Sequence, residues 1–385
     1  MPNKTDIPFL DLKAITALHQ EQIDEAVLRT AHSGWFLRGH ETERFEEAYA
    51  QYIGVPYCIG CGNGLDALTL IFMAYKEMGL MSDGDEVVVP ANTYIASILA
   101  ITRCRLKPVL VEPDIDTLQI DSRKIEEAIT PRTKALMIVH LYGRCAYTEA
   151  IGSICARHHL RLVEDNAQAH GCVYHQEVAS SGVSHTGSFG DAAHSFYPTK
   201  NLGALGDAGA VTTRDAELAH LVRALGNYGS GEKYVFDHLG INSRMDEMQA
   251  AILRAKLPYL DQENEVRRQH ALFYYKALDN TCVHLLPASY LSDNVFHLFP
   301  ILCDDRDALR AHLAQQHIQT DVHYPIPPHK QRCYSQYNKA SFPITEYIHS
   351  HILSLPISQV LTQEQQQTVA DAINHFHTTY PCQKH

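Results

Sequence analysis

The chain has 385 residues, more than one hydrophobic core usually supports, so we expect two domains. With 44 acidic against 32 basic residues the formal net charge is −12, which argues against nucleic acid or an anionic membrane surface as the main partner. The apolar runs are far shorter than the roughly 20 residues of a membrane span, and the N-terminus lacks a secretory pattern, so a cytoplasmic protein is expected.

The cysteines and histidines give no sign of a metal site. Ten cysteines are scattered without the regular framework of a small secreted domain, so most are expected to be reduced and packed. Cys58 and Cys61 form a C-x-x-C pair, but no second pair or histidine partner accompanies it, which disfavours redox or zinc chemistry. His323 and His329 share a proline-rich loop that lacks a carboxylate or cysteine to complete a metal site.

Strands and helices are predicted to alternate along the first two thirds of the chain. Runs rich in β-branched residues predict strands, and apolar spacings of three and four residues predict helices packed on a sheet. The predicted strands cover 86–90, 108–113, 135–143, 161–165 and 210–213, and the predicted helices cover 65–75, 122–129 and 150–159. This alternation is typical of an α/β protein with a mostly parallel sheet.

The pattern changes after Arg244. A long helical tract over 245–278 is followed by short elements without the earlier alternation. We therefore expect a large domain over 1–255 and a smaller α+β domain over 256–385.

The first candidate site is the segment CGNGLDALTL at 61–70, where glycines follow a strand-like piece and precede a predicted helix. Free backbone N–H groups at such a helix start bind phosphate, helped by the positive end of the helix dipole. A plain tight turn is the alternative. The glycine spacing does not match the G-x-G-x-x-G dinucleotide fingerprint, which disfavours a nicotinamide-dependent oxidoreductase.

The second candidate site is VEDNAQAHG at 163–171, where an apolar strand ends in two carboxylates. Carboxylates at the C-terminal end of a parallel strand face the crevice in which α/β folds bind ligands. Taken alone, Glu164 and Asp165 are more often a cap for the next helix than a catalytic pair.

The third candidate is Lys200, which lies between the aromatic residues Phe196 and Tyr197 and a glycine-rich turn. In a constrained, partly buried loop, the pKa of a lysine can be depressed, and such a lysine can form a Schiff base. The alternative interpretation of Lys200 is an ordinary lysine in a hairpin loop. A phosphate cradle, a carboxylate for a protonated ring nitrogen and a Schiff-base lysine, in this order, together indicate pyridoxal 5′-phosphate (PLP).

The sequence also resembles a known family, the DegT/StrS group of nucleotide-sugar aminotransferases, over nearly its whole length. The segments GNGLDAL and PANTYIAS look most like the branch that aminates carbon 3 of dTDP-linked 3-keto-6-deoxyhexoses. The collinear segments are IPFLDLK (7–13), SGWFLRGHETERFE (33–46), GNGLDAL (62–68), GDEVVVPANTYIAS (84–97), EDNAQAHG (164–171), GSFGDAAHSFYPTKNLGALGDAGA (187–210), GINSRMDEMQAAIL (240–253) and HYPIPPHKQ (323–331).

The resemblance implies a fold-type I, aspartate aminotransferase-like PLP enzyme with a seven-stranded, mostly parallel sheet. It implies that Lys200 forms the internal aldimine with PLP and later moves the proton between substrate and cofactor. Asp165 would pair with the pyridine nitrogen and keep the ring protonated. Gln168 would hydrogen-bond near the phenolic oxygen of the ring; a plain helix-turn amide is the alternative.

Further residues are assigned to the cofactor by the same resemblance. Tyr94 matches an aromatic position that stacks on the ring, and Asn63, Gly64 and Ser195 match positions that hold the phosphate. Asn242 corresponds to a residue that the neighbouring subunit contributes, which implies a homodimer with shared active sites. Each of these residues also has a purely structural interpretation. Tyr94 could be a core aromatic, Ser195 a strand hydroxyl bonded to the backbone, and Asn242 a helix cap.

The implied reaction moves an amino group from L-glutamate to the 3-keto carbon of a dTDP-3-keto-6-deoxyhexose. His323, Tyr324 and His329 lie in a loop that resembles one approaching the sugar or its nucleotide. The alternatives are amination of carbon 4 in a dTDP- or UDP-linked sugar, a dehydratase that has histidine in place of Lys200, and a PLP-binding regulatory protein without turnover. His194 departs from the apolar residue that relatives often have, and its role is open from sequence.

Overall fold

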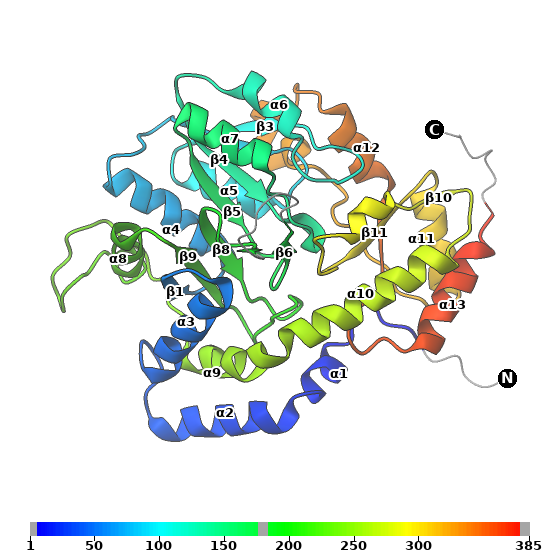
Figure 1. The fold of residues 1–385 in the computed structure, drawn as a ribbon, viewed down its shortest axis with the longest axis horizontal. Helices are drawn as coiled ribbons and strands as arrows, with labels where there is room; N and C mark the ends of the chain where they lie inside the picture. Colours follow the sequence, from blue (N-terminus) through cyan, green and yellow to red (C-terminus); the bar gives the residue numbers. More distant parts are fainter. Residues whose placement is uncertain (1–5, 176–183, 378–385) are drawn as a thin grey trace.

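A seven-stranded sheet with the order β1-β9-β8-β5-β4-β2-β3 forms the centre of the molecule (Figure 1). The computed structural model describes residues 6–175 and 184–377. The strands of this sheet are β1 (Tyr57–Cys61), β2 (Glu86–Pro90), β3 (Lys107–Val111), β4 (Thr133–Val139), β5 (Arg161–Asp165), β8 (Asp191–Ser195) and β9 (Gly209–Thr213). Only β9 runs against the others, pairing antiparallel with β1 and β8, which confirms the expected mostly parallel sheet.

All five strands that the sequence predicts are present, with shifts of a few residues at their ends. Strand β8 was not predicted, because DAAHS combines small and polar residues and lacks a β-branched run. It is nevertheless almost fully buried between β5 and β9, where helices on both faces exclude water.

Helices cover both faces of the sheet, so helices, sheet and helices form three layers. Val87 and Val89 pack with α4, α5 and α8, whereas Val88 points to the other face and packs with α7, as the two-residue repeat of a strand requires. The helices are α1 (Leu12–Ala17), α2 (Gln20–Ser33), α3 (His40–Ile53), α4 (Gly64–Glu77), α5 (Ile95–Arg103), α6 (Ser122–Ile125), α7 (Glu149–His158), α8 (Ala216–Leu225), α9 (Glu247–Lys256), α10 (Leu260–Ala277), α11 (Arg306–Gln315), α12 (Pro343–His351) and α13 (Gln363–Asn374).

The predicted helical tract over 245–278 is two helices, α9 and α10, with a short 3-10 turn between them at Leu257–Tyr259. Pro258 lies in this turn and lacks the N–H that a continuous helix needs. In Figure 1, α9 lies below the central sheet and α10 continues toward the C-terminal elements. The helix pair therefore connects the two halves of the molecule.

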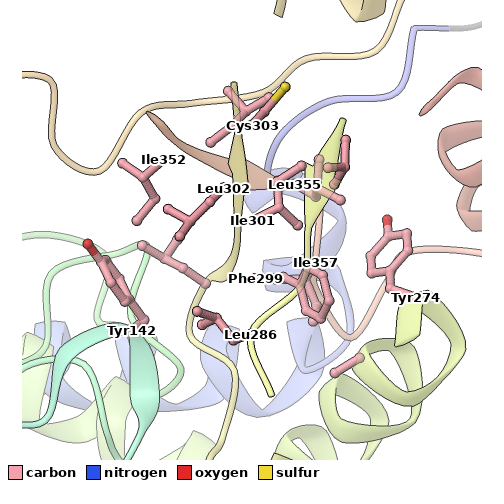
Figure 2. Close-up of a cluster of buried hydrophobic side chains, with 14 of the residues drawn as sticks. Tyr142, Tyr274, Leu286, Phe299, Ile301, Leu302, Cys303, Ile352, Leu355 and Ile357 are labelled. Atoms are coloured by element: carbon pink, nitrogen blue, oxygen red, sulfur yellow. The ribbon is translucent and has the colours of Figure 1, made fainter. Parts of the chain in front are cut away.

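The C-terminal part is built around a second, antiparallel sheet with the order β10-β11-β12. Its strands are β10 (Val283–His284), β11 (Phe299–Cys303) and β12 (Ile352–Leu355), and a separate ribbon pairs β6 (Val173–Tyr174) with β7 (Ser184–His185). Figure 2 shows the core here: Tyr274 of α10 and Tyr142 approach the apolar side chains of β11 and β12 from two sides. Tyr142 follows β4, so this core includes residues of the central α/β unit.

The first described residues pack against the C-terminal part. The N–H of Ile7 donates to the carbonyl of His317 at 2.8 Å, and the N–H of Gln319 donates to the carbonyl of Ile7 at 3.0 Å. Ile7 is buried in the core that contains β11 and β12. The division near residue 256 stays a prediction, and this N-terminal strand-like contact lies across it.

Candidate active site

A cavity of about 470 Å³ opens at the carboxyl ends of the parallel strands, where β4, β5 and β8 meet the starts of α4 and α5. This is the edge at which α/β folds bind ligands. Nine residues singled out in the sequence line it: Asn63, Gly64, Tyr94, Asp165, Gln168, Ser195, Lys200, His323 and Tyr324. Residues up to 261 positions apart in the chain, Asn63 and Tyr324, thus line one cavity.

The start of α4 forms a tight cradle beside Ser195. Asn63 caps the helix by accepting a hydrogen bond from the N–H of Asp66 at 2.9 Å, while Gly64 and the following residue line the cavity with N–H groups that have no partner within the helix. A Cβ atom on Gly64 would lie 2.6 Å from the Cβ of Ser195. Only glycine therefore lets the start of α4 lie this close to Ser195. An anion that binds the helix start and the serine together requires this close approach.

Asp165 ends β5 and lies in the floor of the cavity. The hydroxyl of Ser97 donates to its Oδ2 at 2.8 Å, and the N–H of Ala167 donates to its Oδ1 at 3.2 Å. Burial raises the pKa of Asp165, and these two hydrogen bonds and the nearby Lys200 act in the opposite direction. A buried carboxylate of this kind is stabilised by a further positive charge, such as a protonated ring nitrogen.

Lys200 follows β8 on a loop whose backbone is held by a hydrogen bond from its N–H to the carbonyl of Tyr197 at 2.8 Å. Burial lowers the pKa of Lys200 from 10.5 to about 8, and the charge of Asp165 counteracts part of that decrease. The amine is consequently a better nucleophile near neutral pH than an ordinary lysine.

Two tyrosines and an amide form a further part of the cavity lining. The Nε2 of Gln168 donates to the hydroxyl of Tyr324 at 2.9 Å, and its Oε1 accepts from the N–H of Tyr142 at 2.6 Å. The ring of Tyr94 is half exposed and lies 5.0 Å from that of Tyr324, between centroids. This wall presents flat aromatic surface and a fixed amide to a planar ligand.

The proline-rich loop contributes two of its three predicted residues. His323 lines the cavity, with its Nδ1 3.0 Å from the hydroxyl of Ser354, and Tyr324 follows it. His329 does not reach the cavity: its ring is fully buried, with Nε2 3.0 Å from Oε1 of Glu346. His329 thus packs inside the protein, and its predicted contact with substrate stays a prediction that the cavity lining does not support.

Asn242 lies outside this cavity. It lines a separate surface hollow together with Arg103 and the exposed Leu239, and it pairs with Asn227 in an isolated bridge. Asn242 is not among the residues that line the active-site cavity of its own chain. Its predicted role in a neighbouring subunit's site stays a prediction.

The two carboxylates of the ED pair have different environments. Glu164 is fully buried, lies 2.8 Å from Nε2 of His140, and accepts hydrogen bonds from the N–H groups of Gly187, Phe189 and Gly190. It holds the segment before β8, whereas Asp165 faces the cavity. Neighbouring residues of a strand point to opposite faces, but the sequence alone does not show which of the two faces the cavity.

His194, whose role the sequence left open, is a buried residue of β8. Its Nδ1 is 3.0 Å from the hydroxyl of Tyr49, and its Nε2 is 2.7 Å from the hydroxyl of Thr212. Burial lowers the pKa of His194 to about 3, so the ring is neutral. It replaces an apolar side chain by one whose polar atoms are both satisfied, and it does not line the cavity.

Sequence reasoning missed Ser97, Tyr142 and His297, which support or line the cavity. Ser97 falls in the segment PANTYIAS, but nothing in that segment shows that it reaches Asp165. Tyr142 and His297 lie next to apolar runs and look like packing residues. Within residues 6–175 and 184–377, no group of three or more His, Cys, Asp or Glu side chains could hold a metal ion.

The cysteines agree with the expectation of mostly reduced residues: eight of those described are free, and both members of the C-x-x-C pair are buried. Burial raises the pKa of the Cys58 and Cys61 thiols, so neither is a reactive thiolate. Over the same described part, no helix has the length and apolarity needed to cross a membrane.

Comparison with known proteins identifies the family. The model of the DegT/DnrJ/EryC1/StrS aminotransferase family matches residues 18–374. The chain is 52% identical over 371 residues to the dTDP-3-amino-3,6-dideoxy-alpha-D-galactopyranose transaminase of Aneurinibacillus thermoaerophilus, which covers 96% of this chain and 99% of that protein. The chain therefore belongs to the DegT/DnrJ/EryC1/StrS aminotransferase family, as the sequence resemblance indicated.

Solved structures agree in fold. The structure of DesV from S. venezuelae, in complex with a ketimine intermediate, superposes with a TM-score of 0.89 at 43% identity, covering 96% of this chain and 98% of that one. The structure of NtdA from Bacillus subtilis, with bound cofactor PMP, has a TM-score of 0.86 at 32% identity and covers 97% and 86% of the two chains. The predicted fold class is confirmed.

PLP is the cofactor that the family implies, and the cavity residues fit it. The glycine cradle at Gly64, which a Cβ atom would fill, suits the phosphate. The buried carboxylate of Asp165 suits a protonated ring nitrogen, and the buried amine of Lys200 suits the aldehyde. The three groups lie in one cavity.

Proposed function

We propose that this protein is a PLP-dependent aminotransferase that transfers the amino group of L-glutamate to the 3-keto carbon of a dTDP-3-keto-6-deoxyhexose. The product is a dTDP-3-amino-3,6-dideoxyhexose, a precursor for an amino-sugar-containing glycan. The observation that carries the proposal is the convergence of Lys200, Asp165 and the Gly64 cradle in one cavity. The 52% identity to a transaminase named for a dTDP-3-amino-3,6-dideoxy sugar supports the substrate class.

Lys200 has two tasks in this proposal. When bound, PLP supplies the carbonyl that receives the amino group and a ring that takes up the electron pair of the breaking C–H bond. The amine of Lys200 would hold the cofactor. When an amino donor frees it, the same amine would remove and carry the proton of the donor's α-carbon. Its pKa of about 8 suits both directions near neutral pH.

The other cavity residues bind and orient. Asp165 holds the proton on the ring nitrogen, and Ser97 fixes the carboxylate. The start of α4 and Ser195 hold the phosphate. Tyr94 offers its ring face to the cofactor, and Gln168 lies within the same wall. In this assignment the phosphate fixes the position of the cofactor. The part of the cavity beside Lys200 is left for the amino donor and the keto sugar.

A homodimer with shared sites is part of the proposal. Asn242 of one copy would contact the phosphate that is bound in the neighbouring copy. Trp35 and Phe36 are 63% and 55% exposed, and Leu239 is 91% exposed, which is unusual for large apolar side chains in water. The N–H of Glu247 donates to the carbonyl of Phe36 at 3.0 Å, so the exposed 35–36 segment adjoins the segment that carries Asn242.

Subunit mixing tests the shared site. Lys200→Ala and Asn242→Ala variants are each expected to be inactive, and a random mixture should recover about a quarter of wild-type activity, because half the dimers are hybrids with one intact site. A mixture that stays inactive, or an active monomer in light scattering, would contradict the shared site.

A half-reaction assay tests the enzyme assignment. Holoenzyme mixed with L-glutamate should lose the visible absorption of the lysine-linked cofactor and release 2-oxoglutarate. Failure with every amino donor would favour a PLP-binding regulatory protein. Incubation with 3-keto and 4-keto dTDP- and UDP-sugars then tests the acceptor, and amination of a UDP-4-keto sugar alone would overturn the proposed substrate.

A further inference from the structure

His297 lines the same cavity as Lys200 but was not recognised in the sequence. It lies two residues before the start of β11, and only 8% of its surface is exposed. The loop that carries it is fixed, because Arg267 of α10 donates to the carbonyls of Phe296 and Ile357 at 3.3 and 3.1 Å. The imidazole therefore has a defined position in the wall.

The neighbours of His297 select one tautomer. Asn201, the residue after Lys200, donates through its Nδ2 to Oδ1 of Asn264 at 2.7 Å and to the carbonyl of Val295 at 3.1 Å. The Oδ1 of Asn201 is therefore the atom that lies 3.2 Å from Nδ1 of His297, and it can only accept. The hydrogen consequently sits on Nδ1 of His297.

A hydrogen bond at the other end of this series, away from His297, sets the orientation of the Asn264 amide and through it that of the Asn201 amide. The Nδ2 of Asn264 donates to the carbonyl of His170 at 2.9 Å, and a backbone carbonyl cannot donate in return. This fixes Oδ1 of Asn264 as the acceptor for Asn201. Three buried side chains thus form one directed series that ends at Nδ1 of the histidine.

Nε2 is then left as a lone-pair acceptor. Burial and the nearby positive charges of Lys200 and Arg267 lower the pKa of His297 well below its usual value, so the ring is neutral. With Nδ1 turned to Asn201, Nε2 is the polar atom that this ring offers to a ligand in the cavity.

The chemistry of the substrates decides which group it meets. Within the acceptor substrate, the diphosphate of the nucleotide sugar carries no hydrogen near neutral pH, and its negative charge repels a lone pair. A sugar hydroxyl carries a hydrogen and has none of this charge. We propose that Nε2 of His297 accepts a hydrogen bond from a hydroxyl of the keto sugar and makes that hydroxyl a requirement for turnover.

This inference rests on the proposed function and assigns a specificity-determining residue to it. A site built to bond a hydroxyl discriminates strongly against the deoxy analogue, because the buried acceptor is left without a partner. The wild-type enzyme should therefore lose about 10- to 100-fold in kcat/KM when one particular sugar hydroxyl is replaced by hydrogen. The glutamate half-reaction does not involve this contact and should not need it.

Two variants separate the two nitrogens of the ring. His297→Asn keeps a donor near the position of Nδ1 and lacks the distal acceptor, whereas His297→Gln places an amide near the position of Nε2. The experiment measures each half-reaction of the holoenzyme for both variants. For His297→Asn we expect the glutamate half-reaction within about twofold of wild type, the sugar half-reaction lowered about 10- to 100-fold, and the discrimination against the deoxy sugar abolished. His297→Gln should recover part of the loss.

The outcomes distinguish this inference from the proposed function. Equal losses in both half-reactions, or unchanged discrimination in His297→Asn, would overturn the role of His297. Should neither variant bind PLP, the wild-type enzyme still decides: turnover of a keto sugar and all its singly deoxygenated analogues at similar rates would overturn the inference alone. No turnover of any keto sugar by an enzyme that reacts with glutamate would refute the proposed substrate and the inference with it.

Discussion

Gly64→Ala should weaken PLP binding without unfolding the protein. The new Cβ would lie 2.6 Å from the Cβ and 3.2 Å from the Cα of Ser195. Ordinary carbon contacts are about 3.5–4.0 Å, so the helix start and the serine must separate by roughly 1 Å. The helix start cannot simply retreat, because Gly209 already lies so close to Asn63 that a Cβ there would be 2.4 Å from its carbonyl carbon.

The expected magnitude follows from the phosphate hydrogen bonds. A bond of about 2.9 Å that lengthens by roughly 1 Å is no longer a hydrogen bond. Each hydrogen bond to a charged group contributes about 1.5–3 kcal/mol, so losing one raises the dissociation constant of PLP about 10- to 100-fold. The overpacking itself costs about 1–3 kcal/mol of folding free energy.

Titration of apoprotein with PLP, followed by visible absorption, measures the dissociation constant, and thermal unfolding of the apoprotein measures stability. Gly231→Ala is the matched control, because no atom lies within 4 Å of the added Cβ, and it should bind PLP like wild type. Wild-type affinity in Gly64→Ala, with the apoprotein folded, would refute the assignment of the cradle to the phosphate.

Three further predictions concern ionisable groups. Asp165→Asn keeps the shape of the side chain and removes its charge, so the rate of the glutamate half-reaction in stopped-flow absorption should fall about 100-fold or more, and an unchanged rate would exclude the ring-nitrogen role. The rate at which apoprotein captures PLP should rise with pH around a midpoint near 8, where Lys200 loses its proton, rather than near 10.5, and Asp165→Asn should lower that midpoint. His194 has a folded pKa of about 3, below its unfolded value near 6.5, so its stabilising contribution is present above pH 6.5 and is lost as pH falls toward 3. In denaturant melts His194→Gln should therefore reduce the pH slope of stability by about 1.4 kcal/mol per pH unit, and an unchanged slope would mean that His194 is not buried as a neutral ring.

Much of the fold was predictable because its signals are local. β-branched runs indicated β2 to β5 and β9, and the glycines before an amphipathic stretch indicated the start of α4. Strand β8 and the break at Pro258 were missed, because the first is specified by burial between two strands and the second lies within an otherwise continuous helical pattern. The bridge between Ile7 and Ile318 joins residues more than 300 positions apart and has no local signal.

The candidate site was predictable where a residue type is required by the cofactor chemistry. Lys200, Asp165 and the Gly64 turn each have a chemical reason to occur in their segments. The partners that tune them had no such reason: Ser97 acts through a hydrogen bond to Asp165, and His297 through its bond to Asn201. Such roles depend on distances between side chains of different elements, and only the folded chain supplies those distances.

The proposed reaction moves a nitrogen atom from glutamate into the sugar, and an isotope label follows that atom. The enzyme is incubated with PLP, ¹⁵N-labelled L-glutamate and a dTDP-3-keto-6-deoxyhexose, and the product is analysed by mass spectrometry and NMR. We expect a dTDP-3-amino-3,6-dideoxyhexose with ¹⁵N bonded to carbon 3 and stoichiometric 2-oxoglutarate, and none of either with Lys200→Ala. An unaltered keto sugar, or label that enters only carbon 4 of another nucleotide sugar, would contradict the proposed reaction.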